Sequence, residues 1–117
     1  MRADKVQHRA AKTGFDYENA SGAMVDLMNE VAELDEAMNE GTARHQQEEL
    51  GDVLFSAVNV ARLLHIDPEE ALTRSTEKFM DRFEKVERIA AQRGMDMSKT
   101  PIDELNALWA EAKGNII

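Results

Sequence analysis

The chain has 117 residues, of which 43 % are hydrophobic and 32 % charged, and its formal net charge is −9. This length predicts one domain, residues 1–117. The hydrophobic content excludes an intrinsically disordered chain, which would be too polar to bury a core. The absence of Cys excludes disulfides and thiolate metal sites. The acidic balance speaks against binding nucleic acid through a basic surface. No apolar run approaches the ~20 residues that span a bilayer, and the polar first residues favour a cytoplasmic protein.

Helix start and stop signals predict an all-α fold. Asp67 and Pro68 form a start signal, with an N-cap acid before a proline in the first turn. Glycines 14, 41, 94 and 114 mark helix ends. The links are short, which favours antiparallel neighbours in a five-helix bundle. We expect helices over residues 3–13, 21–40, 43–65, 68–93 and 101–113.

Two pairs of acids carry the strongest chemical signal. Glu30 and Glu33 are three residues apart, as are Glu49 and Asp52, so each pair shares a helix face. Two antiparallel helices joined near Gly41 would bring the four carboxylates together at the margin of the core. Their mutual repulsion favours a bound divalent cation, and oxygen-only ligands favour Mg²⁺, with Mn²⁺ as a substitute.

The apolar stripes beside these acids are also predicted from helical periodicity. In the second helix the expected buried stripe is Leu27, Val31, Leu34 and Met38. In the third helix the expected buried stripe is Leu50, Val53, Leu54, Ala57, Ala61 and Leu64.

A solvated acidic face is the ordinary alternative, because acidic pairs with this spacing are common on exposed helices. A di-iron carboxylate bundle is disfavoured, since its Glu-x-x-His motif is absent. We expect His8, His45 and His65 to lie at the surface or at helix ends.

Three pairs of residues at i, i+4 spacing are candidates for nucleotide contacts. Lys78 and Arg82 flank the apolar stripe of the fourth helix and suit phosphate oxygens. Trp109 and Lys113 lie in the last helix, where the only Trp is a candidate to stack on a base. Lys5 and Arg9 form the third pair. A solvated basic face, or a Trp that anchors the core, explains the same patterns.

The ordered set of motifs resembles the MazG family of nucleoside triphosphate pyrophosphohydrolases, in particular the C-terminal catalytic domain of two-domain bacterial MazG proteins. The resemblance covers nearly the whole chain. It runs through residues 2–7 and 9–17, Glu30-x-x-Glu33, Glu49-x-x-Asp52, residues 59–63, 77–83 and 84–89, Trp109 and Lys113. The family commonly has Trp at the position of Tyr17 and often Asn at that of Thr76.

The resemblance implies a homodimer that hydrolyses a nucleoside triphosphate, NTP or dNTP, to the monophosphate and pyrophosphate. Glu30, Glu33, Glu49 and Asp52 would hold Mg²⁺, and Glu33 or Glu48 would accept the proton of the attacking water. Lys78 and Arg82 would hold phosphates. Other nucleotide contacts would come from Trp109, Lys113, Lys5 and Arg9, while Asn59 would orient the sugar, the base or a water molecule.

Two classes of alternative remain open at the level of sequence. The first is a narrower enzyme, such as an all-α dUTP or dCTP pyrophosphatase or a phosphoribosyl-ATP pyrophosphohydrolase. The second is a non-catalytic, nucleotide-sensing helical dimerisation module, which would keep the apolar stripes. The acidic quartet speaks against the second class, because clustered carboxylates at a core margin do not help a scaffold.

Overall fold

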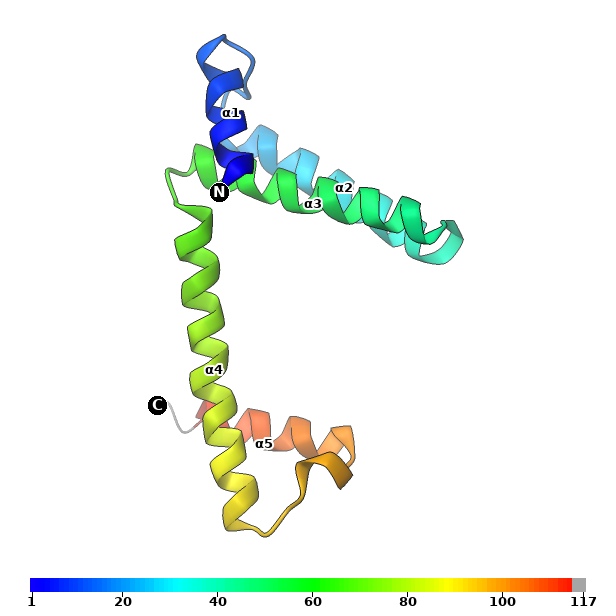
Figure 1. The fold of residues 1–117 in the computed structure, drawn as a ribbon, viewed down its shortest axis with the longest axis vertical. Coiled ribbons are helices and arrows are strands. Elements are labelled where there is room, and N and C mark those ends of the chain that lie inside the picture. Colours follow the sequence, from blue (N-terminus) through cyan, green and yellow to red (C-terminus); the bar gives the residue numbers. More distant parts are fainter. Residues whose placement is uncertain (115–117) are drawn as a thin grey trace. The chain divides into compact units, whose positions relative to one another are not determined.

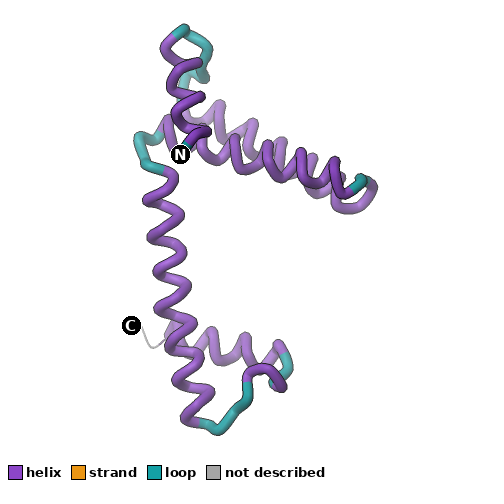
Figure 2. The backbone as a smooth tube through the Cα atoms, viewed as in Figure 1, coloured by secondary structure: helices purple, strands orange, loops and turns teal. Residues whose placement is uncertain are grey.

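The computed structural model describes residues 1–114, and every regular element in this range is helical (Figures 1 and 2). The elements are α1 (Arg2–Lys12), α2 (Ala20–Glu40), α3 (Ala43–Leu63), α4 (Pro68–Gln92), the 3-10 helix η1 (Met97–Lys99) and α5 (Ile102–Gly114). The predicted all-α fold with five α-helices is confirmed. No helix in the described range is long and apolar enough to cross a membrane.

The chain divides into two compact units, with the division inside α4. Unit 1 is Met1–Ala71, and unit 2 begins at Leu72. The single domain expected from the chain length stays a prediction.

Unit 1 is built on an antiparallel pair of long helices, α2 and α3, with α1 packed against α3 (Figure 1). Both long helices begin at side-chain caps. The side-chain oxygen of Asn19 accepts a hydrogen bond from the Gly22 amide at 3.1 Å, and that of Thr42 accepts from the His45 amide at 3.2 Å. Such caps satisfy amides that the first helical turn leaves unpaired. The tight link at Gly41 therefore fixes the register between the two helices.

The stripe predicted for α2 is wrong in part, because Val31 is 50 % exposed and Met38 is 65 % exposed. Ala23 and Ala37 are buried instead, so the face towards α3 follows Ala23, Leu27, Glu30, Leu34 and Ala37. Small alanines allow two helix backbones to approach closely. As a result Glu30 lies within the face of α2 that α3 covers, whereas the sequence predicts it only at the border of the apolar stripe.

The stripe predicted for α3 is also displaced. Leu50, Leu54 and Leu64 are exposed, although the sequence predicts them to be buried. One covered face of α3 follows Gln46, Glu49, Val53, Ser56, Val60 and Leu63, at alternating spacings of three and four residues, and Val58 and Asn59 are buried as well. Leu50, Leu54 and Leu64 therefore face solvent in the single chain.

Most helix bounds lie within one residue of the prediction, and two differences are larger. α3 ends at Leu63 rather than at His65, because His65 takes a left-handed φ of 59° that no right-handed helix accommodates. Before α5 the chain forms η1, which the sequence does not predict and which begins at the side-chain cap of Asp96. The predicted start at Asp67 is confirmed, since its carboxylate accepts from the Glu69 amide at 2.9 Å.

The core of unit 2 lies between α4 and α5. Val86 and Ala90 from α4 pack with Leu108 and Ala112 from α5. An exposed ion pair joins the same two helices, with Arg93 nitrogens 2.6 and 2.9 Å from the Glu111 carboxylate oxygens. These contacts hold α5 beside the half of α4 that carries Lys78 and Arg82.

Candidate active site

An acidic cluster lies between α2 and α3 in unit 1. Glu30, Glu49 and Asp52 each offer a carboxylate oxygen, and these oxygens lie within 4.8 Å of one another. The helix pairing predicted from the sequence therefore does bring acids from both motifs together. Glu30 and Glu49 are half-buried and Asp52 is exposed, so the cluster opens to solvent on one side.

Two of these carboxylates have oxygens that are both buried and unsatisfied. Oε2 of Glu30 and Oε2 of Glu49 have no hydrogen-bond partner in the described part of the chain. An unsatisfied buried carboxylate oxygen is costly, because it has lost its contact with water without gaining another partner. These two oxygens are therefore available to bind a proton or a cation.

The electrostatics of the cluster agree with this geometry. The pKa of Glu30 is raised from its ordinary 4.5 to about 7, first by burial and then by interactions with Glu33, Asp52 and Glu49. Both causes disfavour the charged form of Glu30, since burial removes water from its carboxylate and the neighbouring acids repel its negative charge.

The donor set suits a small, hard cation. The three clustered groups offer only carboxylate oxygens, which Mg²⁺ and Mn²⁺ prefer, and offer no sulfur for softer metals. The nearest nitrogen named in an ion pair is Nε2 of His45, 3.4 Å from Oε1 of Glu49. His45 is exposed, as are His8 and His65, which confirms the surface positions expected for all three.

Glu33 and Glu48 lie outside the three-residue cluster. Glu33 is exposed on α2 and close enough to Glu30 to raise its pKa. Glu48 is 63 % exposed at its side chain and lies 3.5 Å from Nε of Arg44. Of the two candidate proton acceptors, Glu33 is therefore the one coupled to the cluster.

A basic pocket of about 800 Å³ lies in unit 2. The structure brings Lys78, Arg82, Trp109 and Lys113, four of the predicted nucleotide-binding residues, into its lining. The Arg82 guanidinium carbon lies 4.5 Å from the Trp109 ring centroid, a cation–π arrangement. The Phe79 ring lies nearby in a tilted arrangement, with its centroid 5.2 Å from that of Trp109 and 39° between the ring planes. Trp109 therefore serves as a wall of this pocket as well as a contact of the core.

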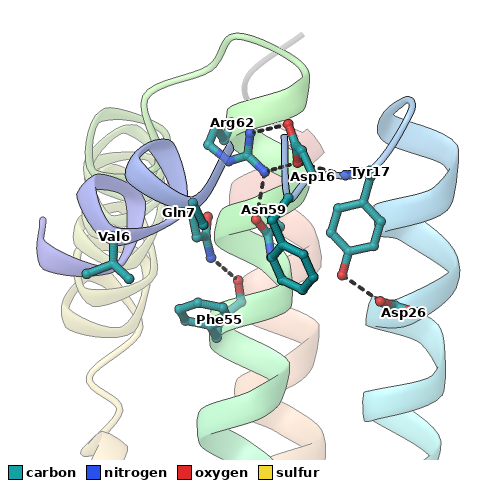
Figure 3. Close-up of a pocket in the computed structure, with 10 residues that line it drawn as sticks. Val6, Gln7, Asp16, Tyr17, Asp26, Phe55, Asn59 and Arg62 are labelled. Atoms are coloured by element: carbon teal, nitrogen blue, oxygen red, sulfur yellow. Dashed lines mark hydrogen bonds and ion pairs between the residues drawn. The ribbon is translucent and has the colours of Figure 1, made fainter. Parts of the chain in front are cut away.

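A second pocket, of about 450 Å³, lies in unit 1 between α1, the Phe15–Tyr17 segment and α3 (Figure 3). Asn59 lines this pocket, whereas none of the four predicted metal ligands does. Asp16 and Arg62 are joined across it by hydrogen bonds of 2.6 and 2.9 Å. The sequence analysis missed this ion pair, although the i, i+3 spacing of Asn59 and Arg62 already placed both on one face of α3.

The remaining predicted contacts are not gathered into either pocket. Lys5 and Arg9 are exposed on α1 and line neither of these two pockets.

Tyr17, at a position where the resembling family commonly has Trp, donates a hydrogen bond from its hydroxyl to Asp26 at 2.5 Å. The Thr76 hydroxyl donates to the Leu72 carbonyl of its own helix at 2.9 Å.

Comparison with known protein families finds a match over α2, α3 and most of α4, the helices that carry the acidic cluster, Lys78 and Arg82. A family profile described as the MazG nucleotide pyrophosphohydrolase domain matches residues 18–87, which include both acidic motifs, Lys78 and Arg82. The chain belongs to the MazG family.

Curated relatives extend the MazG likeness over almost the whole chain. It is 39 % identical to a nucleoside triphosphate pyrophosphohydrolase/pyrophosphatase MazG of Thermotoga maritima, over 96 % of this chain and 43 % of the relative. It is 41 % identical to a nucleoside triphosphate pyrophosphohydrolase of Escherichia coli K12, over 97 % of this chain and 44 % of the relative. An uncharacterized protein YabN of Bacillus subtilis is 45 % identical over 56 % of the chain. The chain thus spans less than half the length of these curated relatives.

Proposed function

We propose that this chain hydrolyses nucleoside triphosphates, NTPs or dNTPs, to the nucleoside monophosphate and pyrophosphate, with Mg²⁺ as cofactor. One observation carries the proposal. Glu30, Glu49 and Asp52 converge from two helices, and two of them hold buried oxygens without partners. Membership of the MazG family and the names of the relatives from Thermotoga maritima and Escherichia coli support the same reaction.

Each acidic residue has a proposed role. Glu30, Glu49 and Asp52 would hold the cation, and the exposed Glu33 would add its negative charge to the site. When bound, Mg²⁺ would neutralise phosphate oxygens and lower the pKa of an attacking water. Glu33 accepts the proton of that water, because it is exposed and already interacts with Glu30.

The basic pocket of unit 2 supplies the opposite charge. Lys78, Arg82 and Lys113 would donate hydrogen bonds to phosphate oxygens of the nucleotide. Trp109 holds the Arg82 guanidinium against its ring, which limits the rotamers of a long side chain before substrate arrives. Lys5 and Arg9 stay second-tier candidates for nucleotide contacts.

We also propose that the protein works as a homodimer. Several large apolar side chains on the outer faces of α2 and α3 are half or more exposed in the single chain; they are Val25, Met28, Val31 and Leu54, at 57, 65, 50 and 60 %. Burying such a surface against a second copy would remove apolar area from water in a symmetric interface. Sedimentation of the chain should therefore give twice the monomer mass.

The reaction is tested by resolving the products of each of the eight common NTPs and dNTPs, with Mg²⁺ and with a chelator. We expect nucleoside monophosphate and pyrophosphate with Mg²⁺ only, and the rates rank the bases, which tests the narrower dUTP or dCTP pyrophosphatase. Glu49→Gln should reduce turnover by at least about 100-fold, since it removes a ligand charge. Glu36→Gln makes the same change at an exposed position of α2 and should retain activity.

Two outcomes would remove the proposal. Nucleoside diphosphate and orthophosphate as products would indicate a different hydrolysis. Failure to produce any product while nucleotide still raises the melting temperature would favour a nucleotide-sensing module.

A further inference from the structure

His45 lies beside the acidic cluster and has no role in the chemistry proposed above. It is the third residue of α3, and its imidazole Nε2 lies 3.4 Å from Oε1 of Glu49, one helical turn further along. His45 is not one of the three residues whose carboxylate oxygens converge. Its ring therefore contacts the cluster from outside, through one of the proposed cation ligands.

The backbone of His45 is held by the cap of α3. Its amide donates to Oγ1 of Thr42 at 3.2 Å, the kind of side-chain hydrogen bond that begins many helices. Thr42 follows directly after Gly41 in the short link between α2 and α3. This link therefore also determines where the His45 side chain starts.

The ring of His45 is held between that link and Glu49. A Cβ built at Gly41 would lie 2.8 Å from Nδ1 of the ring, which is too close for two atoms that are not bonded. The ring therefore lies directly against a backbone position that carries no side chain. Its other nitrogen, Nε2, is the one beside the Glu49 carboxylate.

The neighbouring pair on the same helix shows what distinguishes this contact. Arg44 and Glu48 also lie four residues apart, at 3.5 Å, but their side chains are 90 and 63 % exposed. Exposed pairs on a helix contribute little, because water screens them. The side chain of Glu49 is only 15 % exposed, so its interaction with His45 is screened much less.

The two carboxylate oxygens of Glu49 have different surroundings. Oε1 faces His45, whereas Oε2 is buried and has no hydrogen-bond partner in the part of the chain that the structure describes. The last torsion of a glutamate is broad and two-fold, so an unrestrained carboxylate rotates and exchanges its two oxygens. Contact between one oxygen and a held ring restricts this rotation.

We propose that His45 is a positioning residue for cation binding: its ring holds Oε1 of Glu49, so that Oε2 stays free to bind the cation. This inference rests on the proposed function, because it takes the acidic cluster as the cation site. A neutral imidazole carries one N–H, and placed on Nε2 it donates towards Oε1. Removing a group that orients a metal ligand commonly weakens metal binding by about 10- to 100-fold.

The affinity of the full chain for Mn²⁺, without nucleotide and at constant pH, tests the inference. The electron paramagnetic resonance signal of free Mn²⁺ decreases as the ion binds. His45→Ala should weaken binding about tenfold, and His45→Gln, whose amide nitrogen can replace Nε2 as a donor, should restore most of the affinity. His8→Ala makes the same change at an exposed histidine of α1 and should bind Mn²⁺ as the wild type does. Equal affinity in His45→Ala and the wild type would overturn the inference.

Two other results would also overturn it. If His45 itself bound the ion, glutamine would not replace it, and His45→Gln would bind Mn²⁺ as weakly as His45→Ala does. If His45 acted only in folding, the loss of affinity would follow the melting temperatures of the metal-free variants. We expect instead that saturating Mg²⁺ restores the kcat of His45→Ala, at an apparent Mg²⁺ constant raised by the same factor as the Kd of Mn²⁺.

Failure of this inference differs from failure of the proposed function. A wild-type chain that binds no Mn²⁺ would remove both. Mn²⁺ binding that depends on His45, without hydrolysis of any nucleotide, would remove the proposed reaction and keep the role of His45. Hydrolysis together with the same Mn²⁺ affinity in His45→Ala and the wild type would do the reverse.

Discussion

Glu30 on α2 and Glu49 on α3 turn carboxylate oxygens towards each other across the antiparallel pair, and each keeps one buried oxygen without a partner. Two like charges facing one another destabilise the structure that holds them unless a proton or a cation lies between them. The stability of the folded chain should therefore depend on pH through this cluster, and on the concentration of the cation that we propose it binds.

The metal-free protein should lose stability as the pH rises from about 5 to 8. The pKa of Glu30 is about 7 in the folded chain and 4.5 when unperturbed, so the folded state binds the extra proton in this window. Stability falls with rising pH wherever the folded state holds more protons than the unfolded state. Glu30→Gln should flatten this part of the curve, measured by denaturant unfolding in EDTA. His45 is present in both the wild type and Glu30→Gln, so the difference between their stability curves isolates the contribution of Glu30.

Mg²⁺ should raise the melting temperature of the wild type at pH 8, because a ligand that binds only the folded state stabilises it. Asp52→Asn should show a much smaller rise, whereas Asp35→Asn, at an exposed position of α2, should match the wild type. An equal rise in all three proteins would place the bound cation elsewhere.

Much of this site could be predicted from sequence, because helical periodicity and the turn at Gly41 determine which faces of α2 and α3 meet. The acidic cluster and the basic pocket around Arg82 and Trp109 both follow from such spacing. The Asp16–Arg62 pair could not be predicted, since it joins residues 46 positions apart through a loop without regular structure. The buried stripe of α3 is predicted wrongly for a related reason. This helix has two apolar faces, and its sequence does not indicate which of them the rest of the chain covers.

Gly41→Ala should lower the free energy of unfolding by about 1–3 kcal/mol, because a Cβ there would lie 2.7 Å from the Ala37 carbonyl oxygen and 2.8 Å from Nδ1 of His45. Gly51→Ala is the matched control within α3, where a Cβ meets nothing within 4 Å. It should stabilise the helix by about 0.5–1 kcal/mol. Urea unfolding of both variants measures the contrast, and a stabilised Gly41→Ala would contradict the described turn.

His65→Gly should raise the free energy of unfolding by about 1 kcal/mol. His65 holds a left-handed backbone with φ of 59° just after α3, and an L side chain is strained there. Thermal and urea unfolding check the change, and His65→Ala should not reproduce the gain, because alanine keeps the Cβ. Equal stability of His65→Gly and His65→Ala would show that the backbone strain is absent.

The fluorescence of Trp109, the only Trp in the chain, should report phosphate binding in the basic pocket. Phosphate that engages Arg82 alters a guanidinium lying 4.5 Å from the ring centroid. Adding pyrophosphate should change the emission with a saturable dependence, which Arg82→Ala should weaken strongly. Arg88→Ala, on an exposed arginine of α4 outside the pocket, is the control and should respond as the wild type does.

We propose that the acidic cluster of α2 and α3 holds the divalent cation used in hydrolysis, and binding of Mn²⁺ tests this proposal most directly. Substoichiometric Mn²⁺ added to the isotope-labelled chain broadens NMR signals of nuclei close to the ion. We predict that the amide signals of Glu30, Glu49 and Asp52 broaden first, and that Asp52→Asn weakens the effect. Broadening that begins at other acidic residues, or is unchanged in Asp52→Asn, would contradict the claim.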